Sequence, residues 1–93
     1  MGHVAKEKNK LLNRLKRLRG QIDAIERAVE ADLECAGVLQ QATSCRGALD
    51  GFIAEVIEDH IREHMLDPRA PRDDPRVIAA EELVDIVHAY LKK

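Results

Sequence analysis

Four residues of this 93-residue chain are candidate ligands of one metal ion: His3, Cys35, His60 and His64. His60 and His64 stand four apart, so on a helix they share one face, which is the spacing of a bidentate helical metal site. Two solvated histidines on an acidic helix show the same spacing, so the pair alone is weak support. With the Cys35 thiolate, the two imidazoles suit Ni(II), Co(II) or Zn(II), whereas Cu(I) prefers a second thiolate.

The separation of Cys35 from the histidines decides how such a site can form. Cys35 precedes His60 by 25 residues, close to seven helical turns, so the two project from nearly the same face but about 37 Å apart. Two antiparallel copies of the helix bring them together and cross near Gly47 and Ala48. Small residues lie around this crossing: Thr43, Ser44, Gly47, Ala48 and Gly51. They predict close packing of two chains, with a shared metal site or without one.

Two further candidate donors are less informative. If Met1 is retained, the free amine and His3 form an amino-terminal copper or nickel chelate; removal of Met1 before Gly2 leaves His3 as an extra ligand or as none. Cys45 lies about 15 Å along the helix from Cys35 and on its apolar stripe. We interpret Cys45 as a core residue.

The elements that must position these residues are helices. Apolar residues alternate at spacings of four and three through Leu11, Leu15, Leu18, Ile22, Ile25 and Val29, which predicts a helix over about residues 5–30. Asp32 is the predicted N-cap of a second helix of some 33 residues, with no proline before Pro68. Residues 67–75 hold all three prolines and predict a loop. Asp74 and Pro75 predict the N-cap and first position of a third helix.

The length of the second helix predicts an oligomer. It would span about 50 Å at about 1.5 Å per residue, whereas a compact chain of this size is on the order of 30 Å across. Either the helix breaks or another chain covers its projecting end, and the uninterrupted apolar stripe favours the second.

Composition agrees with an all-α chain that forms one domain over residues 1–93. Aromatic residues make up 2% of the chain and charged residues 34%, so the core must consist of Leu, Ile, Val and Ala, which helices accommodate best. No apolar run reaches the roughly 18 residues of a membrane span, and no secretory signal opens the chain. We therefore expect a cytoplasmic protein without a membrane partner.

Basic residues are concentrated near the N-terminus. Residues 6–19 contain seven basic residues and one acid, a charge of +6; since the whole chain carries −2, the remainder carries −8. One polar stripe of the first helix holds Lys10, Arg14, Arg17 and Gln21. A solvated helix can carry such a stripe, but the segregation of charge favours double-stranded DNA as partner. Because no Gly-rich phosphate loop, paired-carboxylate cleft or catalytic triad is visible, we do not expect an enzyme.

The chain resembles, over nearly its whole length, the small all-helical bacterial repressors of the CsoR/RcnR/FrmR family. The matching stretches are RLKRLRGQI (14–22), EC (34–35), LQQ (39–41), RGA (46–48), EVIEDHI (55–61) and AYLK (89–92). The resemblance implies a three-helix protomer, a dimer of antiparallel helices and a flat dimer-of-dimers tetramer. It also implies operator DNA that is released when an inducer binds between subunits.

The subgroups of this family differ at the inducer site. Copper sensors carry cysteine where this chain has His64, whereas nickel and cobalt sensors resemble it at His3, Cys35, His60 and His64 together. Formaldehyde sensors resemble its helical body but have proline after the initiator Met and an acid at the position of His64. We therefore predict a metal-responsive repressor induced by Ni(II) or Co(II), with Zn(II) as a less favoured candidate. Two alternatives stay open: a formaldehyde-responsive repressor using the Gly2 amine and the Cys35 thiol, and a metal storage or delivery protein.

Overall fold

The heptad-like repeat near the N-terminus forms the first described helix, α2, at Lys8–Glu30. The structure is a computed structural model that describes residues 8–91. Leu11 and Leu18 are buried against the rest of the protein, but Leu15, Ile22 and Val29 remain 36%, 54% and 59% exposed. Leu11 and Leu18, which are seven residues apart, thus pack inside the protomer. Leu15, Ile22 and Val29, which also follow one another at intervals of seven, face outward. The predicted helix is confirmed over residues 8–30, while residues 5–7 lie outside the described residues. The outward-facing Leu15, Ile22 and Val29 are available to another protein surface.

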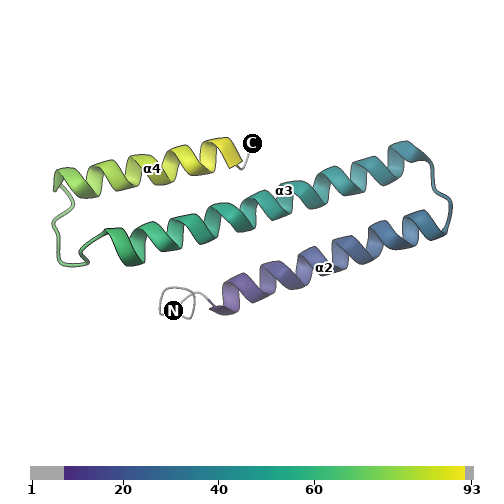
Figure 1. The fold of residues 1–93 in the computed structure, drawn as a ribbon, viewed down its shortest axis with the longest axis horizontal. Coiled ribbons are helices and arrows are strands. Elements are labelled where there is room, and N and C mark those ends of the chain that lie inside the picture. The colour runs from purple at the N-terminus through teal and green to yellow at the C-terminus, as the bar shows by residue number, and fades with distance from the viewer. Residues whose placement is uncertain (1–7, 92–93) are drawn as a thin grey trace.

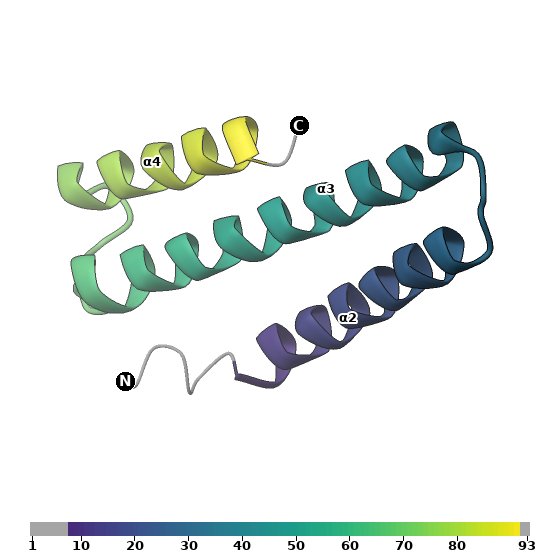
Figure 2. The same cartoon turned by 45° about the vertical axis from the view of Figure 1, so that its right-hand side comes forward.

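The second helix, α3, covers Cys35–His60 and continues without interruption into a short π-helical turn, η1, at Ile61–Met65. The third long helix, α4, covers Pro75–Leu91. All three long helices lie in one layer, with α2 and α4 on opposite sides of α3 and α4 beside only its C-terminal half (Figures 1 and 2). The all-helical prediction is confirmed for the described residues.

The turn between α2 and α3 corrects one prediction. Asp32 is not the N-cap of α3, because the residue before the helix is Glu34. Asp32 instead has a φ of 58°, and it ends α2: its amide donates to Val29 O at 3.1 Å and the next amide, Leu33 N, donates to Ala28 O at 3.0 Å. These two bonds form a Schellman motif, in which a left-handed residue reverses the chain. Asp takes this conformation more readily than most residues.

Replacement of Asp32 should reveal the cost of that conformation. Left-handed backbone costs a residue with a Cβ about 1–2 kcal/mol, and glycine almost nothing. Asp32→Val should therefore lower the free energy of unfolding by about 1 kcal/mol or more, whereas Asp32→Gly should match or exceed the parent. Urea unfolding followed by circular dichroism measures both variants. Equal stability of the valine and glycine variants would contradict the assignment.

The start of α4 is as predicted. Pro75 is its first residue, and Asp74 Oδ1 accepts a hydrogen bond from Arg76 N at 2.8 Å. The side chain therefore satisfies one of the amides that have no partner inside the helix, and the fixed φ of proline suits the first position.

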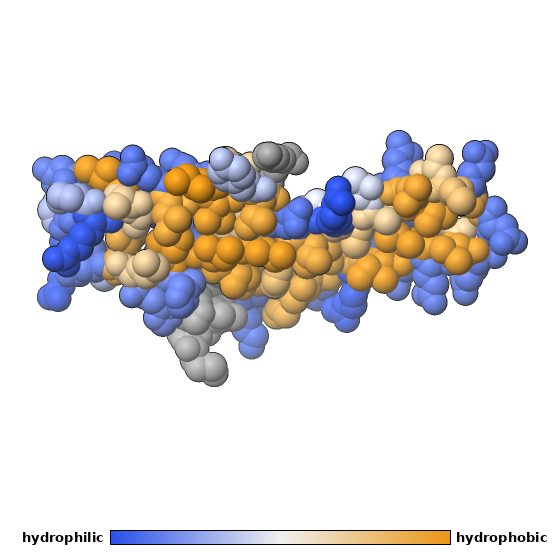
Figure 3. Space-filling view, turned by 45° about the horizontal axis from the view of Figure 1, so that its top comes forward, coloured by the Kyte–Doolittle hydropathy of each residue, from blue (hydrophilic) through white to orange (hydrophobic). Residues whose placement is uncertain are grey.

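The protomer is a thin slab with a small core. It measures 56 × 25 × 14 Å, and its radius of gyration is 17.3 Å, against about 12 Å for a compact chain of this length. Large apolar side chains are exposed on all three long helices, among them Leu39 (64%), Leu49 (46%), Ile86 (52%) and Tyr90 (72%). Figure 3 shows an apolar band along most of one face. A surface of this extent is typical of proteins that associate.

The middle of α3 lies open beyond the end of α4. A hollow of about 590 Å³ there is lined by Gly47, Ala48 and Gly51 of α3 and by Tyr90 and Leu91 of α4, among others. Gly47 is exposed, and a Cβ added to it would meet nothing within 4 Å. The predicted crossing point of two α3 helices is thus accessible in the protomer.

Within residues 8–91, no helix combines the length and apolar character that crossing a lipid bilayer requires.

Candidate metal centre and nucleic-acid interface

The two histidines of the predicted metal site lie side by side. His60 ends α3 and His64 belongs to η1; both are exposed, and their ring centroids are 5.0 Å apart with planes inclined by 34°. With metal–nitrogen bonds of about 2.0–2.1 Å, an ion sits about 3.2 Å from each ring centre, so centroids about 5 Å apart suit two ligands of one ion. The donor types and spacing fit the predicted metals.

Cys35 lies at the other end of α3. It is the first residue of the helix and is exposed, and it borders a cavity of about 390 Å³ lined with Val29, Leu33, Val38 and Leu39 among others. Among the described residues of one chain, no three His, Cys, Asp or Glu side chains gather closely enough to hold a metal ion. The protomer brings His60 and His64 together but not Cys35. His3 and Gly2 lie outside the described residues.

Cys45 has no place near either half of this site. Its thiol is free and half-buried, ten residues along α3 from Cys35. This position agrees with packing rather than with metal binding.

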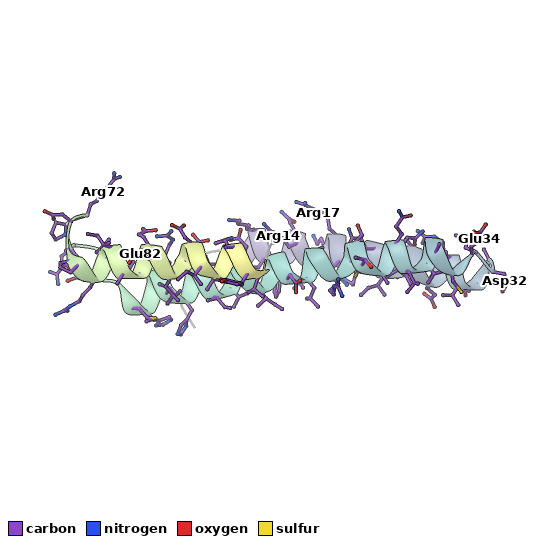
Figure 4. All side chains as sticks on the ribbon, turned by 90° about the horizontal axis from the view of Figure 1, so that it is seen from above. Arg14, Arg17, Asp32, Glu34, Arg72 and Glu82 are labelled. Atoms are coloured by element: carbon purple, nitrogen blue, oxygen red, sulfur yellow. The ribbon has the colours of Figure 1, made fainter. Side chains whose placement is uncertain are left out.

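The predicted DNA stripe on α2 contains residues in different environments. Lys10 Nζ and Arg14 Nη2 each lie 3.2 Å from the carboxylate of Glu55, which is only 8% exposed. Arg17 is exposed and points away from the slab, on the same face as Arg72 (Figure 4). Two of the three basic residues in the stripe therefore balance an internal carboxylate, and Arg17 extends toward solvent.

Gln21, the fourth member of the stripe, faces partly inward. It is half-buried, and its Oε1 is buried without a hydrogen-bond partner, as is Oε1 of Gln41 on α3. Both residues line a cavity of about 160 Å³ between α2 and α3 with Ala24 and Ser44. Gln21 thus borders the space between α2 and α3 rather than open solvent alone.

A network of charged residues beside the histidines was not foreseen from the sequence. Arg62 in η1 forms two hydrogen bonds with Glu81 of α4, at 2.8 and 3.0 Å, and donates from Nε to Glu58 Oε2 at 2.8 Å. The other oxygen of Glu58 lies 2.6 Å from His88 Nε2. An i, i+4 relation links Glu58 to Arg62, but no pattern in the sequence pairs either residue with α4.

The network also sets the charge of its members. Burial raises the pKa of Glu58, but hydrogen bonds from Arg62 and His88 outweigh it, and the pKa ends below its usual value. The hydrogen bonds from Arg62 lower the pKa of Glu81, and the same contacts raise the pKa of Arg62 further above its ordinary value. All three side chains are therefore ionised at neutral pH.

Comparison with known proteins identifies the class. The family model of the metal-sensitive transcriptional repressors matches residues 7–89. The chain is 41% identical over 93 residues to a Serratia marcescens protein described as uncharacterized, in the 5′ region of bioA, with 99% of this chain and 100% of that protein covered. It is 35% identical over 95 residues to the transcriptional repressor RcnR of Citrobacter koseri, with the same coverage.

A solved structure has the same fold. It is a glutamate-to-histidine variant of the formaldehyde-responsive regulator FrmR from Salmonella enterica serovar Typhimurium, with a TM-score of 0.64 and 32% identity, covering 91% of this chain and 94% of that one. The chain therefore belongs to the family of metal-sensitive transcriptional repressors. Members of this family are regulators of transcription and not enzymes.

Proposed function

We propose that this protein represses transcription by binding double-stranded operator DNA and that Ni(II) or Co(II) releases it, with Zn(II) as a less favoured candidate. The inducer site consists of Cys35 from one chain and His60 and His64 from a second, with His3 as a further ligand. The observation that carries the proposal is the pair of adjacent imidazoles, 5.0 Å apart, at one end of a helix whose other end presents an exposed thiol.

A shared site explains the shape of the protomer. The apolar band and the open hollow at Gly47 and Ala48 allow a second α3 to lie antiparallel across the first. That arrangement carries the histidines of one chain to the Cys35 cavity of the other. We propose a dimer of this kind, assembled into a homotetramer in which the site and the basic surface are repeated.

The proposed DNA surface includes the solvent-facing part of the α2 stripe. Phosphate contacts by Lys and Arg supply most of the affinity of such interfaces and make it salt-dependent. Arg17 is the clearest test residue, because removal of Arg14 would also leave Glu55 with one fewer cation. Arg19 provides a matched control on the same helix, since two residues of helix turn it about 200° away from Arg17.

Arg17→Ala should weaken binding to operator DNA and reduce the slope of log K against log salt by about one unit for each phosphate that the arginine neutralises. Arg19→Ala should change both much less. Fluorescence anisotropy at several salt concentrations, with and without Ni(II) or Co(II), measures affinity and release together. Parent protein that stays on DNA when metal is added would refute the proposed induction, and equal effects of the two substitutions would refute the proposed contact surface.

Formaldehyde is the second candidate inducer. It is favoured by the structural similarity to a formaldehyde-responsive regulator and by the exposure of the Cys35 thiol. In that case the carbon of formaldehyde would join the thiol sulfur to the Gly2 amine as a methylene bridge, with its oxygen leaving as water, and His64 would be dispensable. Metal storage or delivery is disfavoured, since the chain belongs to a family of transcriptional repressors.

A further inference from the structure

The π-helical turn η1 needs an explanation beyond apolar packing. Turns of this kind are rare and are frequently found at functional sites. Ile61 is the buried residue of η1, while Met65 at its other end is 59% exposed. The core therefore secures the beginning of the turn, and His64 lies in the part that the core does not hold.

The side chain of Arg62 connects η1 to α3 and α4. Its guanidinium contacts both oxygens of Glu81 and one oxygen of Glu58, so it is held by α3 and α4 at once. Paired hydrogen bonds of this type fix orientation as well as distance, because the planar guanidinium matches a carboxylate. A lysine, with a single point charge, cannot reproduce this geometry.

The network also reaches along α4. Glu58, bound to Arg62, lies 2.6 Å from His88 through its second oxygen. Glu81 and His88 are seven residues apart, which places them on one face of α4 about two turns from each other. The end of α3 and the turn η1 are thus attached to α4 at two points.

We propose that Arg62 is a positioning residue that holds η1 in the conformation in which His60 and His64 present both rings to one metal ion, an inference that rests on the proposed function. Arg62 lies between the two histidines in the chain, so its anchorage to Glu81 restrains the backbone on which His64 is carried. The arrangement of the two imidazole rings is thereby fixed in the metal-free protein.

The experiment compares Arg62→Gln, Arg62→Lys, Glu81→Gln and the double variant Arg62→Gln/Glu81→Gln with the parent, and Arg69→Gln serves as the control. Arg69 contacts a carboxylate at 3.7 Å in the loop and its side chain is 90% exposed. Co(II) titration followed by absorbance gives the affinity and the ligand-field spectrum. Amide hydrogen exchange of the metal-free protein reports on residues 61–66 without any metal.

Arg62→Gln should weaken Co(II) binding about tenfold, as changes to groups that orient metal ligands do, and should speed exchange at residues 61–66 but not in the first half of α3. Glu81→Gln should act in the same direction, and the double variant should be no worse than Arg62→Gln alone, because the two residues act through one contact. Arg62→Lys should recover part of the affinity. Arg69→Gln should resemble the parent in both measurements.

Two results would overturn the inference: Co(II) affinity of Arg62→Gln equal to that of the parent, or unchanged exchange at residues 61–66. Additive effects of Arg62→Gln and Glu81→Gln would also contradict it. A parent protein that binds no Co(II) refutes the proposed function and with it the role of Arg62 toward metal, and the exchange measurement then shows separately whether Arg62 restrains the turn.

Discussion

Cys35→Ala should abolish the release of DNA by metal and by formaldehyde alike. The thiolate is a ligand in one mechanism and the nucleophile in the other. Changes in groups that merely orient metal ligands cost about 10–100-fold in affinity, so loss of a direct ligand should cost more than about 100-fold. Binding of Ni(II) and Co(II) by competition with a chelator, and DNA release by anisotropy, measure the effect.

Cys45→Ala is the matched control, because it removes a half-buried thiol from the same helix and should leave both responses intact.

His64→Glu separates the two inducers. It should lose much of the response to Ni(II), Co(II) and Zn(II), whereas a response to formaldehyde needs only a thiol and an amine. If the parent ignores all three metals and releases DNA with formaldehyde, and His64→Glu does so equally well, the metal assignment is wrong and the formaldehyde mechanism replaces it.

Gly47→Gln should dissociate the assembly while leaving the protomer folded. Inside one chain, a Cβ added to Gly47 has no neighbouring atom within 4 Å, and replacement of a helical glycine raises helix stability by up to about 1 kcal/mol. Between two crossing α3 helices, the same side chain would occupy the space of the partner backbone. We expect the parent to sediment as a tetramer, or at least a dimer, at micromolar concentration and the variant to sediment as a smaller species.

Gly20→Gln provides the comparison. Gly20 is also exposed on a helix, with nothing within 4 Å of an added Cβ, and it lies on the opposite side of α2 from the outward-facing Ile22. This variant should assemble like the parent, and circular dichroism should show both variants to be helical. Metal affinity should fall in Gly47→Gln together with assembly, since the ligands come from two chains. A parent that is a stable monomer, or a Gly47→Gln variant that assembles normally, would contradict both the crossing and the shared site.

The amino-acid sequence by itself determined the local structure of this protein. Apolar periodicity predicted the three long helices, and the pair Asp74–Pro75 predicted the start of α4, because N-capping depends on neighbouring residues alone. The spacing of His60 and His64 predicted adjacent rings. The failure at Asp32 has a local cause as well: Asp is suited both to N-caps and to left-handed helix ends, and its residue type does not choose between them.

Tertiary structure decided which faces of the helices meet. The periodicity of a sequence defines the apolar stripe of a helix but not the surface against which that stripe packs. It therefore did not reveal that Leu11 and Leu18 pack inside the protomer while Leu15 and Ile22 face outward. The contact of Arg14 with Glu55 joins residues 41 positions apart, and that of Arg62 with Glu81 joins residues 19 apart. Such pairs depend on the register in which α2 and α4 pack along α3. That register results from the packing of whole helix surfaces. The same packing turned two predicted DNA-contacting side chains toward Glu55 and joined Arg62, which lies between the two histidines in the chain, to Glu81 of α4.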